Sequence, residues 1–340
     1  MGGSSRWVEL GSGQVRDPEN NAATRCATHF QRHANPRLAF EATYARMREV
    51  SLSYDRAGVA VFAVEARGGR YLGAMCLPSQ HGPPQTGVVG RHSQSPLLVD
   101  CDASLALRQL LFVVEAPGLA GDIRGDVRFR LLDLGSQSPP RDEDGRVVAS
   151  LVAEGPMILY VGGVVVFALP TGDPTDWPER AHDAWACFPE RIYFEERLAE
   201  GSAPRALPRH DPRHTRVTVR QPPAPLAPRL DDGPPIGHLH VRADGKSTHF
   251  PISAEALQRG VLVGRYARCQ AGALAFGDDD RVSRVHACLL EVDGMPWLID
   301  TASTNGLWFR GKQRDCVHLL PGTVVQLGEN ADDATIVWES

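Results

Sequence analysis

Three short polar clusters stand at the ends of apolar stretches between residues 261 and 306. They are Gly264-Arg265, Ser283-Arg284-Val285-His286 and Thr304-Asn305-Gly306. Together they supply a cation, hydroxyl and amide donors, and glycines that let a backbone approach a ligand closely. A phosphate monoester carries close to two negative charges and three strong acceptor oxygens. These residue types are therefore suited to the capture of a phosphate group.

The order of the three clusters resembles the forkhead-associated (FHA) domain, a family of phosphothreonine-binding β-sandwiches. By this resemblance, Arg265 contacts the phosphate through its planar guanidinium, whose paired hydrogen bonds Lys cannot reproduce. Ser283 donates its hydroxyl to the phosphate, and Arg284 lies in the same phosphate-facing loop. Asn305 binds the peptide backbone beside the phosphothreonine, and Thr304 lines the same pocket.

Gly264, His286 and Gly306 are expected to support this site structurally. By the same resemblance, His286 braces the loops through hydrogen bonds and is not a catalytic base. Gly306 lets the chain turn at positive φ, where a β-carbon would clash. Taken singly, each motif has an ordinary interpretation, since Asn-Gly alone indicates only a hairpin turn. Their joint occurrence in this order favours the FHA interpretation.

The resemblance covers residues 235–340, which we expect to form one β-sandwich. This segment begins with a hairpin signal at Asp244-Gly245 and continues through many short apolar strands. Its length is sufficient for an independently folded sandwich.

Residues 51–172 also show strand periodicity and predict a second, degenerate FHA-like sandwich. In the alignment of the two halves, Gly90-Arg91 falls on the Gly-Arg pair, residues 104–107 on residues 283–286, and residues 130–136 on residues 297–303. Arg91 and Ser104 are retained, but Leu107 stands in place of the His, Gln137-Ser138 in place of Thr-Asn, and Pro139 in place of the Gly. The alternative is another small β-sandwich that matches by chance. We expect this copy to have a structural or docking role that does not depend on phosphate.

The remaining segments frame these two units. In residues 1–50, apolar residues at helical spacing after Asn35-Pro36 predict one amphipathic helix. Residues 173–234 are expected to be a helix followed by a proline-rich linker, with one or two short helices in residues 175–201 and an extended spacer after them. The proline-rich part could instead serve as an SH3-type ligand. The expected fold is therefore mainly β, with two sandwiches joined by a helical and Pro-rich linker and preceded by a helical lead.

Composition narrows the class of protein. A net charge of −5 and a pI near 6.2 give no global case for nucleic-acid binding. Seven scattered cysteines without C-x-x-C spacing indicate reduced thiols in a cytoplasmic protein. The N-terminus lacks the apolar core of a signal peptide, and the apolar run at residues 157–169 is too short to span a bilayer. The richness in Ala, Arg, Gly and Pro suits a bacterium of high GC content.

No nucleophile elbow, P-loop, kinase signature or paired metal-ligand motif is present, so we expect no catalytic residues, no cofactor and no metal. The sequence predicts a non-enzymatic phosphothreonine-binding adaptor. Its expected partners are a phosphothreonine-containing protein and an upstream Ser/Thr protein kinase, with no nucleic acid and no membrane.

Two other classes of function remain open. A structural scaffold would bind its partners without phosphate, and Arg265→Ala would leave that binding intact. An FHA-regulated enzyme would need a deep polar pocket with convergent ionisable groups in residues 1–200. An intramolecular version of the adaptor would use phosphorylated Thr175, Thr215 or Thr218 of the connecting region.

Overall fold

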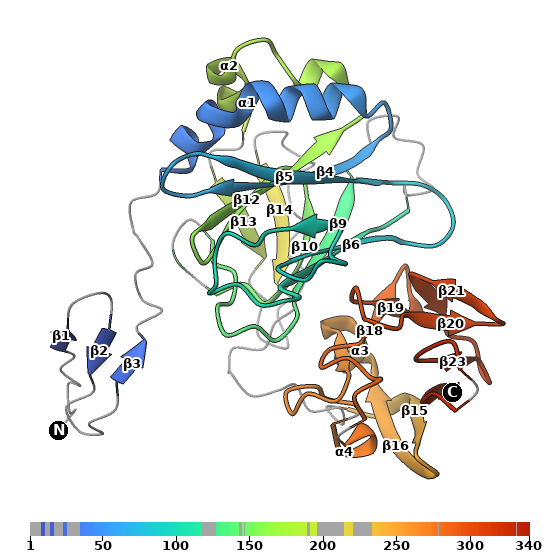
Figure 1. Cartoon of the computed structure of the whole chain (residues 1–340). Coiled ribbons are helices and arrows are strands. Elements are labelled where there is room, and N and C mark those ends of the chain that lie inside the picture. Colours follow the sequence, from blue (N-terminus) through green and yellow to red (C-terminus); the bar gives the residue numbers. More distant parts are fainter. Residues whose placement is uncertain are drawn as a thin grey trace.

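The computed structural model describes residues 8–10, 14–16, 23–25, 35–116, 127–142, 145, 147–188, 191–195, 214–219, 233–271, 273–277, 279–330 and 332–340. It is built mainly of antiparallel strands, as the sequence predicts, and it contains two β-sandwiches (Figure 1).

The N-terminal sandwich consists of two facing sheets. The first sheet has the order β11 (Met157–Val161), β12 (Val164–Thr171), β4 (Gly58–Glu65) and β5 (Tyr71–Pro78). The second has the order β13 (Arg191–Glu195), β14 (His214–Val219), β10 (Ser150–Glu154), β9 (Arg128–Asp133), β8 (Leu110–Val114), β6 (Gln85–Gly90) and β7 (Leu97–Leu98). Alternate residues of both sheets, such as Val61, Phe112 and Leu151, point inward and form one core.

Two helices cover the outer face of the first sheet, as Figure 1 shows above β4 and β5. Helix α1 (Pro36–Ser53) begins where the Asn-Pro signal predicts, because Asn35 caps it by accepting a hydrogen bond from the Arg37 N–H at 3.0 Å. Helix α2 (Ala181–Ala186) packs beside α1, after a short 3-10 turn η1 (Pro174–Asp176). Buried Phe40 and Met47 of α1 make this layer part of the N-terminal unit.

The C-terminal sandwich also has two sheets around a separate core that includes Leu289, Ile336 and Trp338. One sheet has the order β16 (Lys246–Ser253), β15 (Pro235–Ala243), β24 (Thr335–Glu339), β23 (Val324–Gln326), β20 (Leu307–Phe309) and β21 (Lys312–Arg314). The other has the order β17 (Val261–Val263), β18 (Ala287–Val292), β19 (Met295–Asp300) and β22 (Cys316–His318). Short helices α3 (Ala254–Arg259) and α4 (Ala273–Phe276) connect the strands.

The two sandwiches pack sheet against sheet, which the sequence did not predict. The sheet of β6, β8 and β9 faces the sheet of β17, β18 and β19 across one buried apolar cluster, which we call the inter-sandwich interface. Its buried members are Val88, Leu111, Val113, Leu132 and Leu134 from the N-terminal side and Leu262, Cys269, Val285, Cys288, Leu290, Val292 and Ile299 from the C-terminal side. Four sheets therefore stack face to face beneath the helical layer.

Polar contacts flank this interface at both ends. The Arg130 guanidinium donates to the carbonyl of Gln258, and the Ser150 hydroxyl donates to the carbonyl of Arg259 at 3.2 Å. At the other end, Nε of Arg108 donates to the Ala302 carbonyl at 2.8 Å. The two sandwiches are thus held by apolar packing together with hydrogen bonds.

Three expectations about local structure are corrected. Residues 191–195, expected to be helical, form β13, and residues 214–219, expected in the extended spacer, form β14, which pairs with β10. Both strands extend the N-terminal sheet, so Thr215 and Thr218 lie in a strand. Strands β1 (Val8–Leu10), β2 (Gln14–Arg16) and β3 (Ala23–Arg25) form a small sheet in the segment 1–50, for which the sequence predicted only one helix. In each case pairing with a neighbouring strand, and not local periodicity, defines the element.

No helix among the described residues is long and apolar enough to cross a membrane.

Candidate functional site

Arg265 lies where the chain leaves β17, and two hydrogen bonds tie it to the loop that carries Ser283. Its Nε donates to the Val282 carbonyl at 2.9 Å, and its backbone N–H donates to the Ser283 carbonyl at 3.3 Å. The side chain is half-buried and belongs to none of the ion pairs found within the described part of the chain. The guanidinium is therefore held in place and remains available to an anionic ligand.

Gly264 is required by the close approach of these two loops. A β-carbon at this position would collide with the backbone carbonyls of Ser283 and Arg284. The Gly-Arg pair thus combines a tight backbone contact with a positioned cation.

Ser283 and Thr304 lie against each other at the mouth of the site. The backbone N–H of Thr304 donates to Oγ of Ser283 at 3.0 Å, while the Ser283 hydroxyl lies 3.4 Å from Oγ1 of Thr304. Because the bond to Thr304 Oγ1 is long, the Ser283 hydroxyl can turn its proton to a stronger acceptor such as a phosphate oxygen.

His286 is fully buried and bridges two segments of the site. Its Nδ1 accepts from the Ser283 N–H at 3.1 Å, and its Nε2 lies 3.2 Å from the Gly306 carbonyl. Since a carbonyl only accepts, Nε2 carries the proton and the ring is neutral. Burial lowers the pKa of His286 to about 4, and the bond to Gly306 offsets only part of that shift. The ring therefore joins loop to turn as a neutral brace.

Asp300 and Ser303 shape the turn that presents Thr304, and sequence reasoning did not single them out. Asp300 accepts from the Ser303 hydroxyl at 2.5 Å and from the Ser303 N–H at 3.1 Å, and the Gly306 N–H donates to Oγ of Ser303 at 3.0 Å. Burial raises the pKa of Asp300 to about 6, against the lowering effect of the Ser303 bonds. An acidic residue three positions before a serine at a strand end is the signal that could have found this pair.

Asn305 is exposed and anchored from both sides. Its side-chain Nδ2 donates to the Arg281 carbonyl at 2.7 Å, and its backbone carbonyl accepts from Nε1 of Trp308 at 2.9 Å. Arg281 is in turn fixed by Asp279, whose carboxylate accepts from the Arg281 backbone, Nε and Nη2. This pairing with Arg281 is the largest of the causes that lower the pKa of Asp279, and nearby Arg265 adds to it. The acidic run before Arg281 thus orders the loop beside Asn305.

The structure therefore gathers Arg265, Ser283, Thr304 and Asn305 at the loops that follow β17, precede β18 and follow β19. Arg284 is exposed and lines a different pocket, at the inter-sandwich interface, together with residues of the N-terminal sandwich. Gln94 of that sandwich also reaches the site, where its Nε2 lies 3.4 Å from the Thr304 carbonyl.

The N-terminal sandwich carries a matching loop cluster, and hydrogen bonds fix its register. The Arg91 N–H donates to the Ala106 carbonyl at 3.1 Å, as the Arg265 N–H donates to Ser283. Ala106 therefore occupies the position of Ser283. The sequence alignment, which placed Ser104 there, is wrong by two residues.

The counterpart of His286 is Gln109. Its Oε1 accepts from the Ala106 N–H at 2.8 Å, which is the bond that Nδ1 of His286 makes to Ser283. The prediction that Leu107 replaces the histidine is therefore wrong. The apolar residues before β8 had the pattern of a strand, but they belong to the loop.

The turn after β9 repeats the Asp-Ser arrangement. Asp133 accepts from the Ser136 hydroxyl at 2.5 Å and from the Ser136 N–H at 3.1 Å, as Asp300 does from Ser303. Counting on from Ser136, Gln137-Ser138 falls on the positions of Thr304-Asn305, and Pro139 on that of the glycine. This copy therefore lacks the amide side chain and the turn glycine.

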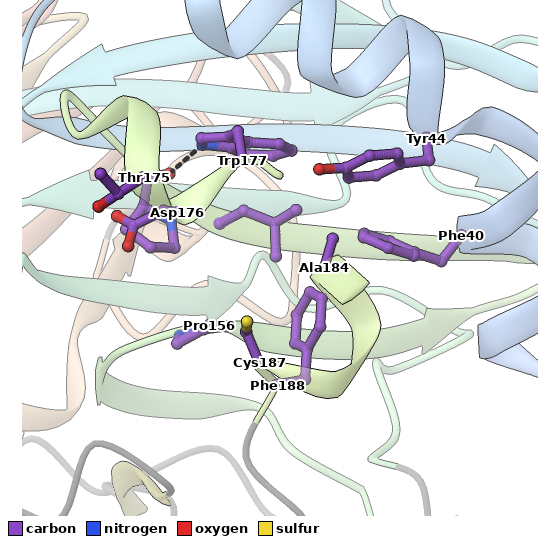
Figure 2. Close-up of a pocket in the computed structure, with 11 residues that line it drawn as sticks. Phe40, Tyr44, Pro156, Thr175, Asp176, Trp177, Ala184, Cys187 and Phe188 are labelled. Atoms are coloured by element: carbon purple, nitrogen blue, oxygen red, sulfur yellow. Dashed lines mark hydrogen bonds between the residues drawn. The ribbon is translucent and has the colours of Figure 1, made fainter. Parts of the chain in front are cut away.

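A separate pocket of about 120 Å³ lies beneath α1 (Figure 2). Phe40 and Tyr44 of α1 face Trp177 across it, and Nε1 of Trp177 donates to the Pro170 carbonyl at 3.3 Å. Aromatic and aliphatic side chains form most of its wall. Tyr44, Asp176 and Cys187 are the ionisable residues in its lining. Within the described ranges, no group of three His, Cys, Asp or Glu residues could hold a metal ion.

Comparison with known proteins identifies the C-terminal sandwich. Residues 261–328 match the family model of the FHA domain. The chain therefore contains an FHA domain, as its three motifs predict. A search of the curated proteins found no match to the chain.

Solved FHA structures are among those similar to the chain. FHA-1 of Rv1747 from Mycobacterium tuberculosis is 25% identical over 30% of this chain and 95% of its own, with a TM-score of 0.24. The FhaA FHA domain, complexed with the intracellular domain of Rv3910, is 22% identical to this chain. The match covers 30% of this chain and 99% of the FhaA chain, with a TM-score of 0.24. Mycobacterium tuberculosis EmbR, in complex with a low-affinity phosphopeptide, is 20% identical to this chain. The match covers 31% of this chain and 24% of the EmbR chain, with a TM-score of 0.24.

Proposed function

We propose that the FHA domain of this chain captures phosphothreonine peptides. Arg265 and Ser283 hold the phosphate, Thr304 lines the pocket, and Asn305 binds the peptide backbone. Arg284, expected to face the phosphate, lines the pocket at the inter-sandwich interface instead. The observation that carries the proposal is the position of Arg265. Its half-buried guanidinium is tied to the Val282 carbonyl beside the Ser283 hydroxyl and has no ion-pair partner among the described residues. A cation held this way favours a doubly charged ligand.

The rigidity of the surrounding loops supports this role. His286 joins the loop of Ser283 to Gly306, and Asp300 with Ser303 fixes the turn between them. Donors that are already positioned lose little conformational freedom when a ligand binds. Gly264 and Gly306 support the site by allowing the close approach and the positive φ of 72° that these loops require.

For the whole chain we propose a non-enzymatic adaptor that acts downstream of a Ser/Thr protein kinase. Its FHA domain spans residues 235–340, and its degenerate FHA-like sandwich is built on residues 51–172. Helix α1 of segment 1–50 and α2, β13 and β14 of segment 173–234 complete that sandwich. The degenerate sandwich serves as the docking or structural half, because it lacks the residues that hold a peptide. A cytoplasmic location stays a prediction that rests on the scattered thiols.

The test is titration calorimetry of the full chain with a degenerate phosphothreonine peptide pool. The full chain is needed because residues 233–340 alone would expose the apolar residues of the inter-sandwich interface. We expect micromolar binding that requires the phosphate and is weakened at least about tenfold by Arg265→Ala. Arg242→Gln, which removes an exposed charge in β15, is the matched control and should bind normally.

A scaffold function is the second candidate, and the inter-sandwich interface favours it. In this interface the FHA domain packs against the N-terminal sandwich through buried apolar residues of both sheets. A folded chain that binds no phosphopeptide in this titration would contradict the adaptor proposal and support the scaffold.

A further inference from the structure

A pocket of about 280 Å³ opens at the inter-sandwich interface, and Arg265 is not among the residues that line it. It is lined by residues 103–108 and 134–137 of the N-terminal sandwich and by Tyr266, Arg284 and Val285 of the FHA domain. Its volume lies just below the range of roughly 300–1,000 Å³ that is usual for drug-sized ligands. The pocket is therefore large enough for a small polar ligand but not for an extended peptide.

Among the residues that the structure describes, three arginines and no acidic residue line this pocket. They are Arg91, Arg108 and Arg284. Arg91 keeps the orientation of its counterpart in the FHA domain, since its Nε donates to the Leu105 carbonyl at 2.6 Å as Arg265 donates to Val282. The phosphate-binding arginine is thus retained in the copy that has lost the peptide anchor.

Arg108 carries an unpaired guanidinium nitrogen that an anion in the pocket could pair with. Its side chain is buried, with 9% exposure, and its Nε donates to the Ala302 carbonyl at 2.8 Å. Its Nη2 is buried and has no hydrogen-bond partner among the residues that the structure describes. A buried guanidinium nitrogen without an acceptor is unfavourable, so such groups are usually paired.

The charged groups around Arg108 do not provide an acceptor for its free guanidinium nitrogen. Burial lowers the pKa of Arg108, Arg284 lowers it further, and Asp300 acts in the opposite direction. Both oxygens of Asp300, however, accept hydrogen bonds from Ser303. Asp102 lies close enough to Arg91 to be affected by its charge, but it accepts from the backbone N–H groups of Ser104 and Gly163. An oxyanion in the pocket would supply the missing acceptor.

We propose that this pocket binds a compact oxyanion, a phosphate or a carboxylate, between Arg91, Arg108 and Arg284. Planar guanidinium groups pair with both kinds of oxyanion through two parallel hydrogen bonds. Because Arg284 comes from the FHA domain and the other two arginines from the N-terminal sandwich, the anion links the two sandwiches. This site is separate from the proposed phosphothreonine site and does not depend on it.

The experiment uses the full chain carrying Arg265→Ala, so that the phosphothreonine site cannot contribute. Inorganic phosphate and succinate are titrated in separate arms at constant ionic strength, and binding is followed by calorimetry and by the rise in Tm. We expect at least one of the two anions to bind, which also identifies the preferred oxyanion. Adding Arg108→Gln should weaken that binding at least about tenfold, whereas adding Arg242→Gln should not change it.

Arg91→Gln in the same background is the second variant, in case Arg108→Gln does not fold. Arg91 is only partly buried, whereas Arg108 is buried, so we expect replacement of Arg91 to disturb folding less. A folded Arg265→Ala chain that binds neither anion would overturn the proposal. The proposal would also be overturned if adding Arg108→Gln or Arg91→Gln to a folded Arg265→Ala chain left anion binding unchanged.

Discussion

The side chains of Gln109 and His286 make the same hydrogen bond in the two sandwiches. Oε1 of Gln109 accepts from the Ala106 N–H at 2.8 Å, and Nδ1 of His286 accepts from the Ser283 N–H at 3.1 Å. Each also reaches the turn after the next strand, since Nε2 of Gln109 donates to the Ser138 carbonyl at 2.9 Å. The brace between loop and turn therefore persists in the N-terminal copy, although the residues that would hold a phosphopeptide do not.

Replacement of this brace should destabilise the FHA domain. In His286→Ala, the buried Ser283 N–H and Gly306 carbonyl lose their partners, so we expect the free energy of unfolding to fall by about 2–4 kcal/mol. His286→Gln should lose less, because an amide can repeat the bonds that Gln109 makes. Urea unfolding of both variants measures the difference. Equal losses would show that an amide cannot replace the ring here.

The stability of the chain should respond to pH through His286. Its pKa is about 4 in the folded protein and 6.5 in the unfolded chain, so between these values the unfolded state binds more protons. The stabilisation is present above pH 6.5 and is lost as pH falls to 4, by roughly 3 kcal/mol.

Asp133 and Asp300 oppose this trend, because burial raises the pKa of each from 3.8 to about 6. Between pH 3.8 and 6 the folded state binds their protons more tightly, so acidification through this window adds stability. The His286 contribution is therefore isolated by subtracting the unfolding free energy of His286→Gln from that of the wild type at each pH. A flat difference between pH 4 and 6.5 would contradict the assignment.

The geometry of the Arg265 guanidinium should matter as much as its charge. Arg265→Lys keeps the charge but loses the Nε bond to Val282 and the paired bonds to a phosphate. We expect it to weaken phosphothreonine-peptide binding by roughly tenfold or more, with little change in Tm. Calorimetry of the wild type and Arg265→Lys checks this, and full binding by the lysine variant would mean that charge alone suffices.

The inter-sandwich interface should stabilise the whole chain. Leu290 is fully buried there, and Leu290→Ala leaves a cavity that we expect to cost about 2–5 kcal/mol. Leu320→Ala is the control, since Leu320 is 53% exposed and outside the interface. Denaturant unfolding measures both, and a loss no larger than that of the control would show that the two sandwiches do not stabilise each other.

The FHA domain and the residues proposed for its binding site could be predicted from local sequence patterns alone. The Gly-Arg, Ser-x-x-His and Asn-Gly motifs lie at strand ends, where local turn chemistry requires these residue types, so they can be read without knowledge of the packing. Helix α1 could also be predicted from the sequence, because its Asn-Pro start and apolar spacing are local signals.

The tertiary structure decided what depends on contacts between distant residues. Strand β14 forms through pairing with β10, and β13 through pairing with β14. The loop before β8 is set by the bond between Gln109 and Ala106. None of these followed from periodicity. The stacking of the two sandwiches brings Arg108 against Ala302 and beside Arg284, far along the chain. No local sequence pattern encodes the contact of Arg108 with Ala302 and Arg284. Two sheet faces pack together only when their surfaces have complementary shapes, and each surface forms from strands distant in the sequence.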